Sequence, residues 1–421
     1  MATTHAPPEG RTRATARVGA AASDVAPLTL RARRLPGQVR GLRVGQFVTV
    51  ELAAVAVLFS IGRPVWVLSA VGAATAVVLG VTFGRRNGRW WHETFGVRRR
   101  LRGRRAARRA YTDEDFRLAA LRELVPALAL HTVAERRNEI GVAQDGVGWF
   151  AAIEVAPERG VRGEAHPPVP LDALAELLVD GGVPISAVQV VIHTTPAPSA
   201  AISPDAPALM SYRTLAEDGS GGPVPAEQTT WVVARLDAQD AAEATRSRGG
   251  GVEGVRRTLA ASLGRIGTVL AEAALPYRLL DAEGLLAALS RSCRIADRAT
   301  ATVAGKPRTD ERWRAWQADG LAHACFWIQS WPVLRQDTPV LNALARFAAE
   351  ATSVSVVLAP RPRGVEVRTF VRLAAETDTL ERSADALRAA AAQVKVRLRR
   401  LDGEHGPAVY ASAPTGGGPD E

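Results

Sequence analysis

Cysteine and lysine are almost absent from this 421-residue chain. The two cysteines, Cys293 and Cys325, form no CxxC pair, so the sequence shows neither a disulfide framework nor a cysteine-ligated zinc site. The two lysines, Lys306 and Lys395, belong to no Walker motif, which argues against a P-loop ATPase. The seven histidines include no HExxH motif and no pair at i, i+4, so they predict no metal site.

Motifs for catalysis are also missing. No GxSxG nucleophile elbow occurs. A nucleotide cyclase would need a pair of metal-binding carboxylates at adjacent strand ends, and no such pair stands out at the predicted strand ends. Residues 249–254 (GGGVEG) fit the GxGxxG pattern of a dinucleotide site, but residues 237–248 separate them from the preceding predicted strand, and no strand ending in an acidic residue follows. We therefore interpret residues 249–254 as a flexible linker before a helix and predict no catalytic, cofactor-binding or metal-binding residues.

Two long apolar runs near the N-terminus are the most informative feature of the chain. Residues 44–61 and 65–83 contain 18 and 19 residues, and the tight turn Gly62-Arg63-Pro64 separates them. As helices they would each span about 28 Å, close to the ~30 Å hydrocarbon core of a bilayer. The pattern predicts a transmembrane helical hairpin with both chain ends on one side of the membrane. A buried helical pair of a soluble protein is the alternative.

Positive charge is concentrated beside the hairpin. Residues 1–109 have a net charge of +16, whereas residues 110–421 have a net charge of −6. The positive-inside rule places both termini and the main domain in the cytoplasm. We expect the arginines after the hairpin to face anionic lipid head groups rather than nucleic acid, because no aromatic-rich basic fold accompanies them. The predicted lipid-facing residues are Arg98, Arg99, Arg100, Arg102, Arg104, Arg105, Arg108 and Arg109.

Two features inside the apolar runs suggest contacts within the membrane. Gly72, Ala76 and Gly80 recur every four residues and form a small-residue stripe that lets another helix approach closely, either the first run of this chain or a partner subunit. Glu51 is an ionisable group inside the first run, which costs roughly 2.5–3.5 kcal/mol on insertion scales. It could be protonated, pair with a partner or reach toward Arg43. No second ionisable residue is embedded to form a proton relay.

The remaining chain alternates strand and helix patterns twice. In the first half the patterns predict helices at 111–125, 171–179, 252–274 and 282–290, and strands within 140–155, at 188–193 and at 231–236. In the second half they predict strands at 322–331, 354–358, 365–373 and 395–400, and helices at 340–350 and 380–392. Each half is approximately β-α-β-β-α-β, so we predict a cytosolic α/β (α+β) domain of two tandem ferredoxin-like units, with helices on one face of each sheet.

These patterns divide the chain into six parts. The parts are a disordered basic cytoplasmic tail (1–43), the transmembrane hairpin (44–83, with helices 44–61 and 65–83), a juxtamembrane basic segment (84–110), a first α/β unit (111–310), a second α/β unit (311–413) and a disordered tail (414–421). We expect Thr112 to cap the first helix of the domain and Asp145-Gly146 to form a hairpin turn. The Pro- and Gly-rich residues 194–228 predict a surface loop.

Two segments resemble the EccE family of type VII secretion systems: residues 35–54 (LPGQVRGLRVGQFVTVELAA), which enter the first apolar run, and residues 146–155 (GVGWFAAIEV), a predicted strand. The order of basic tail, two spans, arginine-rich segment and α/β domain resembles that family as well. The resemblance implies a non-catalytic structural subunit of a complex in the inner (plasma) membrane that exports small WXG100-type helical proteins. It implies EccB, the EccC ATPase, EccD and the mycosin protease as partners, and it offers no catalytic residues. The alternative is a membrane-tethered α/β enzyme or nucleotide-binding signalling protein, for which residues 249–254 are the only hint.

Overall fold

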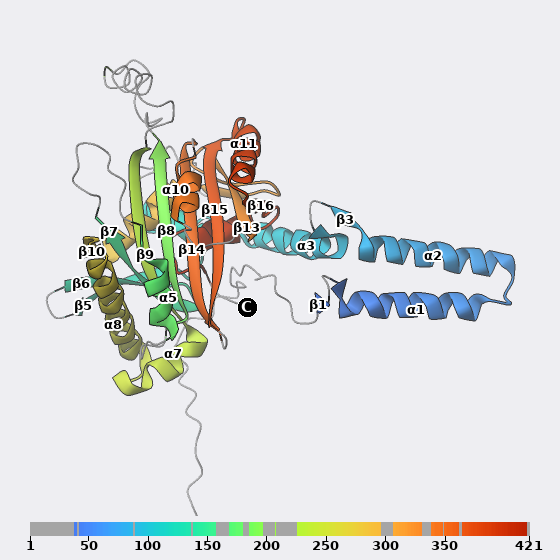
Figure 1. Ribbon diagram of the computed structural model, residues 1–421, viewed down its shortest axis with the longest axis horizontal. Coiled ribbons are helices and arrows are strands. Elements are labelled where there is room, and N and C mark those ends of the chain that lie inside the picture. The colour runs from blue at the N-terminus through green and yellow to red at the C-terminus, as the bar shows by residue number, and fades with distance from the viewer. Residues whose placement is uncertain are drawn as a thin grey trace, which may run out of the picture.

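The computed structural model of the chain describes residues 38–39, 42–86, 89–135, 138–156, 168–179, 185–196, 207, 225–295, 306–330, 338–347, 349–361 and 364–418. Most of the predicted tail 1–43 and of the predicted loop 194–228 therefore lies outside the described residues. A long helical hairpin projects from a domain that is built on one large β-sheet (Figure 1).

The projecting hairpin consists of two antiparallel helices, α1 (Val44–Ser60) and α2 (Val65–Phe83), which begin where the sequence pattern predicts. At its base the Gln46 amide on α1 donates to the carbonyl oxygen of Thr82 on α2 (3.1 Å). Among the described residues, α2 is the one helix long and apolar enough to cross a membrane, and the apolar part of α1 is shorter. Two-residue strands flank the hairpin: β1 (Gln38–Val39), β2 (Leu42–Arg43), β3 (Arg85–Arg86) and β4 (Arg89–Trp90).

A single twelve-stranded sheet forms the centre of the domain. Ten strands lie in the order β11-β12-β13-β15-β14-β8-β9-β7-β6-β5, while β10 pairs with β7 and β16 pairs with β13, and the pairings are antiparallel. The strands are β5 (Ala129–Glu135), β6 (Asn138–Gln144), β7 (Gly148–Val155), β8 (Ala187–Pro196), β9 (Pro225–Asp237), β10 (Tyr277–Leu279), β11 (Thr309–Glu311), β12 (Trp316–Ala318), β13 (Leu321–Ser330), β14 (Ala351–Arg361), β15 (Gly364–Glu376) and β16 (Arg397–Arg400).

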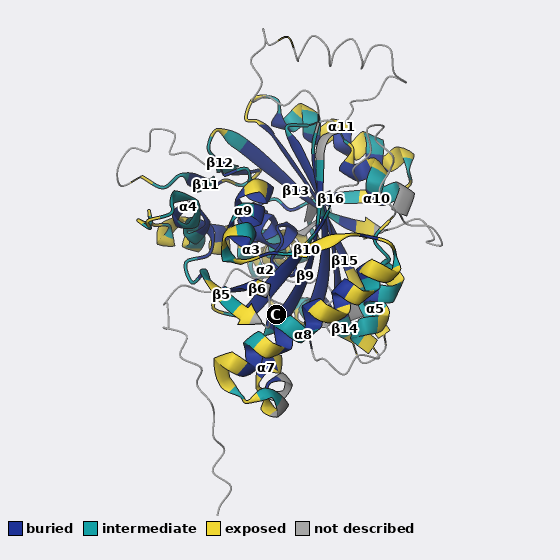
Figure 2. Cartoon of the chain, turned by 90° about the vertical axis from the view of Figure 1, so that its left-hand side faces the viewer, coloured by how far each residue is buried: buried dark blue, intermediate teal, exposed yellow. Residues whose placement is uncertain are grey.

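Helices cover both faces of this sheet (Figure 2). They are α4 (Phe116–Leu124), α5 (Leu171–Val179), α7 (Ala238–Ala244), the 3-10 helix η1 (Arg246–Arg248), α8 (Gly251–Glu272), α9 (Ala282–Cys293), α10 (Thr338–Ala345), α11 (Leu380–Gln393) and α12 (His405–Ser412). α5, α8, α10 and α11 pack on one face over an aliphatic core that includes Leu259 and Leu387. α4, α9 and α12 pack on the other face, over a second core that includes Trp231 and Phe370. The sequence predicted helices on one face only, and the structure adds this second helical layer.

The chain passes through the sheet twice with the same connectivity. β7, α5, β8, β9, α8 and β10 occur in this order along the chain, with α7 and η1 between β9 and α8, and their strands lie in the order β10-β7-β9-β8. β13, α10, β14, β15, α11 and β16 repeat this path, with the order β16-β13-β15-β14. The two sets meet where β8 pairs with β14, from Thr194↔Thr352 to Val188↔Leu358. Both sets therefore belong to one continuous sheet.

Some boundaries differ from the prediction for local reasons. α4 begins at Phe116 instead of residue 111, because the side chain of Asp115, and not that of Thr112, accepts the capping hydrogen bond from the backbone two residues further on (2.8 Å). The helix expected at 340–350 ends at Ala345, and the chain enters β14 six residues later. The hairpin turn at Asp145-Gly146 is confirmed, and Gly146 has the positive φ (+83°) that favours glycine there.

The C-terminal segment is buried instead of disordered. After α12, residues 413–418 continue through the interior, and Thr415 has no exposed surface. The prediction of a disordered tail from residue 414 is therefore wrong for residues 414–418, while 419–421 lie outside the described residues. The glycines that made the segment look disordered allow close packing, since a Cβ on Gly416 would lie 2.4 Å from the Cβ of Arg235.

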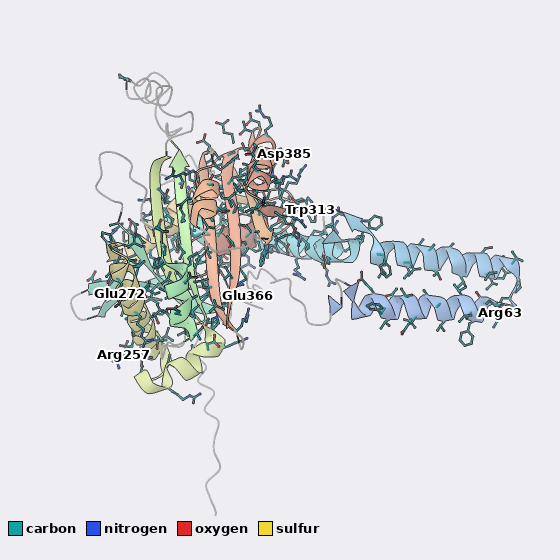
Figure 3. The ribbon with its side chains drawn as sticks, in the orientation of Figure 1. Arg63, Arg257, Glu272, Trp313, Glu366 and Asp385 are labelled. Carbon is teal, nitrogen blue, oxygen red and sulfur yellow. The ribbon has the colours of Figure 1, made fainter. Side chains whose placement is uncertain are left out.

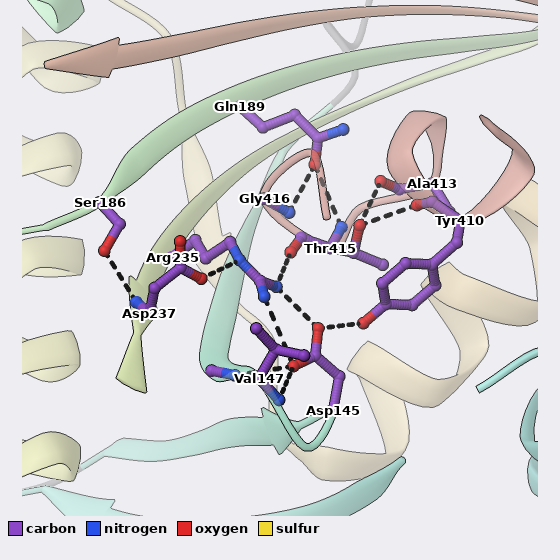
Figure 4. A network of polar contacts seen from close by, with 11 residues as sticks. Asp145, Val147, Ser186, Gln189, Arg235, Asp237, Tyr410, Ala413, Thr415 and Gly416 are labelled. Atoms are coloured by element: carbon purple, nitrogen blue, oxygen red, sulfur yellow. Dashed lines mark hydrogen bonds and ion pairs between the residues drawn. The ribbon is translucent and has the colours of Figure 1, made fainter. Parts of the chain in front are cut away.

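A buried ion pair anchors this segment to the sheet (Figure 4). Arg235 on β9 donates to Oδ2 of Asp145 (2.8 Å) and to the carbonyl oxygen of Thr415 (3.1 Å), and the two charged side chains are only 1% and 2% exposed. The Tyr410 hydroxyl of α12 donates to the same Asp145 oxygen (2.6 Å). Burial alone would raise the pKa of Asp145, but the neighbouring Arg235 charge and the hydrogen bonds hold that pKa below its usual value. The carboxylate is therefore ionised and ties α12 to the sheet.

We expect Gly416→Ala to destabilise the domain by about 1–3 kcal/mol more than Gly418→Ala, because forcing extra atoms into a packed core costs about that much. Both glycines have a positive φ (+83° and +72°), so the backbone strain is shared, but the nearest neighbour of an added Cβ lies at 2.4 Å for Gly416 and 3.7 Å for Gly418. Denaturant unfolding of the two variants measures the difference. Equal free energies of unfolding would contradict close packing of the C-terminal segment on Arg235.

Candidate membrane-proximal docking site

The helix that follows the hairpin, α3 (Trp91–Ala107), lies against the domain along one side. The buried or half-buried side chains on that side recur every three or four residues: Val97, Leu101, Arg104 and, just past the helix end, Arg108. This spacing places them on one stripe of the helix. The stripe is apolar toward the hairpin and basic toward the C-terminal end of α3.

The turn between α2 and α3 is closely packed. The backbone amide of Trp91 donates to the carbonyl oxygen of Gly84 (3.0 Å), and a Cβ on Gly84 would lie 2.7 Å from the Trp91 indole. Glycine at position 84 therefore lets the start of α3 contact the end of α2. The orientation of the hairpin is consequently linked to the position of α3 on the domain.

The central contact of the site is an ion pair between Arg104 and Glu311 of β11. Nε and NH2 of Arg104 donate to Oε2 and Oε1 of Glu311 (2.8 and 2.7 Å), and NH2 also donates to the Gly403 carbonyl oxygen (2.8 Å). Oε1 of Glu311 accepts in addition from the backbone amide of Gly406, in the first turn of α12 (3.1 Å). This two-bonded geometry is stronger than that of an ordinary surface pair, and the side chains are 23% and 10% exposed. Glu311 thus joins α3, β11 and α12.

A second ion pair lies next to the first. Arg108 donates to Oδ1 of Asp310, and Arg312 donates to Oδ2 of the same carboxylate (2.9 Å). Partial burial acts to raise the pKa of Asp310, but the hydrogen bonds from Arg312 and Arg108 lower it below the usual value. Asp310 therefore remains ionised and faces the C-terminal end of α3.

Trp313 provides an apolar surface on which α3 packs, and it lies between that helix and the domain (Figure 3). The guanidinium carbon of Arg98 is 5.3 Å from the centroid of the Trp313 ring, which is within cation–π range. Gly403 (φ +76°) packs between Trp313 and Val97, since an added Cβ would lie 2.5 and 2.6 Å from them. Any larger residue at position 403 would push the helix away from the domain.

The predicted lipid-facing arginines therefore divide into two sets. Arg98, Arg104 and Arg108 contact the domain, as described above. The other five are exposed on α3 or directly after it: Arg99, Arg100, Arg102, Arg105 and Arg109. The sequence identified the arginines but not their partners, because Glu311 lies 207 residues away in the chain. The i, i+4 spacing of Val97 and Leu101 was the one local signal for a buried side.

The residues predicted to make contacts in the membrane lie on the outer surface of the hairpin. Gly72, Ala76 and Gly80 are exposed, and a Cβ added at either glycine would meet nothing within 4 Å. The stripe therefore does not pack against α1, and the half-buried side of α2 is the one that contains Thr75. Glu51 is exposed as well. The Arg63 turn lies at the far end of the hairpin from the domain (Figure 3).

The structure accounts for the glycine-rich residues 249–254 without a ligand. Its first three glycines have positive φ and form the turn from η1 into α8. Gly254 packs on Thr245, whose Cβ would lie 2.7 Å from an added Cβ. Among the described residues, no group of three or more His, Cys, Asp or Glu side chains could hold a metal ion.

We expect Glu311→Gln to loosen α3 from the domain, because the variant keeps the side-chain shape but removes the charge that holds Arg104. Hydrogen bonds to a charged partner contribute roughly 1.5–3 kcal/mol, so amide hydrogen exchange in α3 should become at least tenfold faster. Glu366→Gln is the control, because Glu366 accepts a hydrogen bond from Nε of Arg361 (2.8 Å) at the end of the sheet away from Trp313 (Figure 3). Unchanged exchange in α3 of Glu311→Gln would contradict the role of this pair.

Comparison with known proteins gives one informative match. The family model described as "type VII ESX secretion system translocon, EccE" matches residues 224–328, which extend from the start of β9 into β13. No curated protein matches the chain. A solved structure of alkyldihydroxyacetonephosphate synthase aligns with 59% of this chain and 39% of its own length, at 6% identity and a TM-score of 0.24, a likeness too low to bear on fold or function.

The family match confirms the resemblance that the sequence showed at residues 35–54 and 146–155, and it does so over different residues. Over residues 224–328, the chain is therefore similar to the EccE family of type VII secretion system components.

Proposed function

We propose that this chain is a non-catalytic structural subunit of a type VII secretion complex in the inner membrane. The family match supports membership of the complex. The observation that carries the structural role is the docking of α3, which contacts the apolar hairpin at one end and is fixed to the domain by Arg104 and Glu311. Such a helix transmits the orientation of the membrane part to the cytosolic part.

We infer that both hairpin helices cross the membrane and that both termini and the domain are cytoplasmic. With 17 residues, α1 spans about 26 Å, which suits a slightly thinned bilayer. The arginines are concentrated at the end of the hairpin nearest the domain, and the distal turn contains only Arg63. The positive-inside rule favours this orientation.

We also propose that the two β-α-β-β-α-β sets are tandem ferredoxin-like units that share one sheet. The strand orders β10-β7-β9-β8 and β16-β13-β15-β14 support this interpretation, because each is the order 4-1-3-2 when the strands are numbered along the chain. The second helical layer of α4, α9 and α12 is then an addition to both units.

In this role the partners are other subunits of the complex, EccB, the EccC ATPase, EccD and the mycosin protease, and the exported cargo is small WXG100-type helical proteins. The exposed stripe of Gly72, Ala76 and Gly80 provides a surface for a partner helix, because small side chains let two backbones approach closely. Glu51, exposed on α1, could pair with a polar group of that partner. Energy would come from ATP hydrolysis by the partner ATPase, since this chain has no Walker motif.

We expect replacement of Gly72, Ala76 and Gly80 by leucine to reduce recovery of an FtsK-like ATPase and multi-span proteins at least fivefold when the tagged full-length chain is isolated in mild detergent. Leucine at these positions would prevent close helix approach without adding polarity. Mass spectrometry of the co-purified proteins is the measurement.

The matched control replaces Ala70, Ala74 and Val78 by leucine, because these residues have the same spacing and are equally exposed on another side of α2. Recovery should be unchanged in this control. Equal recovery with the stripe variant would exclude the stripe as a docking surface, and recovery of the wild-type chain alone would argue against the secretion complex.

We expect charge reversal of the five exposed arginines of the α3 region to weaken binding of residues 91–421 to anionic liposomes at least tenfold, since each charge near such a surface contributes about 1 kcal/mol. Both hydrophobic cores are built mainly from residues after Leu118, so the shortened chain retains them. Reversal of five exposed arginines elsewhere is the control: Arg246, Arg257, Arg265, Arg382 and Arg388. Equal loss of binding in both variants would refute a specific lipid-facing side of α3.

A membrane-tethered enzyme or nucleotide-binding protein is the alternative function. Its sequence hint, residues 249–254, is explained by a turn and by packing on Thr245. No described contact favours this alternative over the structural role.

A further inference from the structure

One buried face of the sheet carries a row of polar side chains that crosses five strands. The register places Thr229 on β9, His193 on β8, Ser353 on β14, Arg372 on β15 and Cys325 on β13 opposite one another. All five are buried, and Arg372 is 1% exposed. The row lies on the side of the sheet that α9 and α12 cover, whereas the other side is lined mainly by apolar side chains.

Arg372 is held in this row by hydroxyl groups. Its NH2 group donates to Oγ of Ser292 in the last turn of α9 (2.6 Å) and to Oγ of Ser353 (3.2 Å). Nδ1 of His193 lies 2.9 Å from the same Ser353 oxygen. A third basic group, His323, lies one step along the sheet, where it is paired with Ala374 of β15. The guanidinium therefore lies among polar side chains within the core.

Several nitrogen atoms in this cluster have no protein partner. Within the described part of the chain, Nε and NH1 of Arg372, Nε2 of His193 and both ring nitrogens of His323 are buried without a hydrogen bond. His193 and His323 are 2% and 1% exposed. Leaving one buried polar group unpaired costs about 1–3 kcal/mol, and more for a charged group. Five such atoms on this face of the sheet indicate that the folded protein binds a further, non-protein partner there.

The electrostatic environment specifies the sign of that partner. Burial, together with the positive charges of Arg372, Arg294 and Arg291, lowers the pKa of His193 to about 3. Burial, Arg372 and Arg294 lower the pKa of His323 as well. The largest contributions to both shifts come from burial and arginine charges, and the carboxylate of Glu311, which acts on Cys325, is bonded to Arg104. The cluster thus contains a buried positive charge beside two neutral imidazoles.

The end of α9 does not neutralise this charge by direct contact. Among the described residues, Arg372 contacts α9 through the neutral Ser292 hydroxyl, and the carbonyl groups of Ser290 and Arg291 accept from the backbone amides of Ile295 and Arg294 (2.9 and 3.1 Å). The helix C-terminus contributes only a partial negative charge. A water molecule could satisfy the hydrogen bonds, but it would leave the guanidinium charge uncompensated in a low-dielectric core.

We propose that Arg372, His193 and His323 form a buried site for a small inorganic anion, such as chloride, between the sheet and the last turn of α9. Arg372 supplies the charge, and each neutral imidazole supplies one N–H donor. Arg291, which is exposed, and Arg294, which is half-buried, attract anions to this end of α9. The site is independent of the proposed secretion role, so failure of either proposal leaves the other standing.

The test measures the thermal midpoint of the full-length chain in detergent at constant ionic strength, while chloride, bromide or phosphate replaces gluconate, an anion too large for a buried site. A ligand that binds only the folded state raises the midpoint with its concentration. We expect a saturable rise with chloride and bromide, of about 2 °C at ten times the half-saturating concentration. A response to phosphate with none to chloride would also support the site and would identify an oxyanion as its ligand.

Arg372→Met should abolish this response. If that variant fails to fold, His193→Asn replaces it in the test, and because it changes only one donor it should weaken the response at least threefold. Arg388→Met is the matched control, because it removes the same charge from the exposed side of α11 and should keep the full response. Line broadening of chloride-35 magnetic resonance by the protein gives a second readout that needs no unfolding. Equal midpoints of the wild-type chain in gluconate and in the other anions, or equal responses of wild type and Arg372→Met, would overturn the proposal.

Discussion

The antiparallel pairing of β8 with β14 is the constraint on which the rest of the structure depends. It joins two sets of strands that are each complete in connectivity, and it places side chains of both sets next to one another. Gln189 of β8 donates to Ser355 of β14 (2.7 Å). It also donates to the carbonyl oxygen of Ala411 in α12, which follows both sets in the chain (2.8 Å). The C-terminal segment therefore has a binding surface only when the two sets form one sheet.

The two faces of that sheet are stabilised by different interactions. The face under α5, α8, α10 and α11 is aliphatic and is stabilised by burial of apolar surface, which has little directional preference. The face under α9 and α12 contains Arg235, Arg372 and Gln189, each of which needs partners at defined positions. Buried polar groups of this kind add little net stability but penalise other arrangements. The polar face thus fixes which helix lies where. α12, which Tyr410 links to Asp145, also donates to Glu311, the partner of Arg104 on α3.

The sequence was sufficient to predict elements whose signals are local. The starts of α1, α2, α5 and α11 follow from apolar periodicity and turn residues, and the Asp145-Gly146 turn follows from its dipeptide. It was not sufficient where burial depends on distant residues, such as the contact of Tyr410 with Asp145, which are 265 residues apart. Residues 414–418 show the limit best, because a Gly- and Pro-rich composition is typical of disorder unless a specific surface binds it. Arg235, on a different strand, supplies part of that surface.

The arginine-rich helix α3 shows why composition alone did not predict its contacts. All of its arginines have the same charge, and the strip as a whole is suited to an anionic membrane surface. Yet Arg104 and Arg108 lie on the stripe of Val97 and Leu101, and that position decides that they meet Glu311 and Asp310. Residues 110–421 have a net charge of −6. Two of their acidic residues, which are adjacent at a sheet edge, form ion pairs with the inward arginines of the α3 region. Only the outward arginines are then available for the proposed lipid contact, and under that proposal one helix would contact the domain and the membrane surface at the same time.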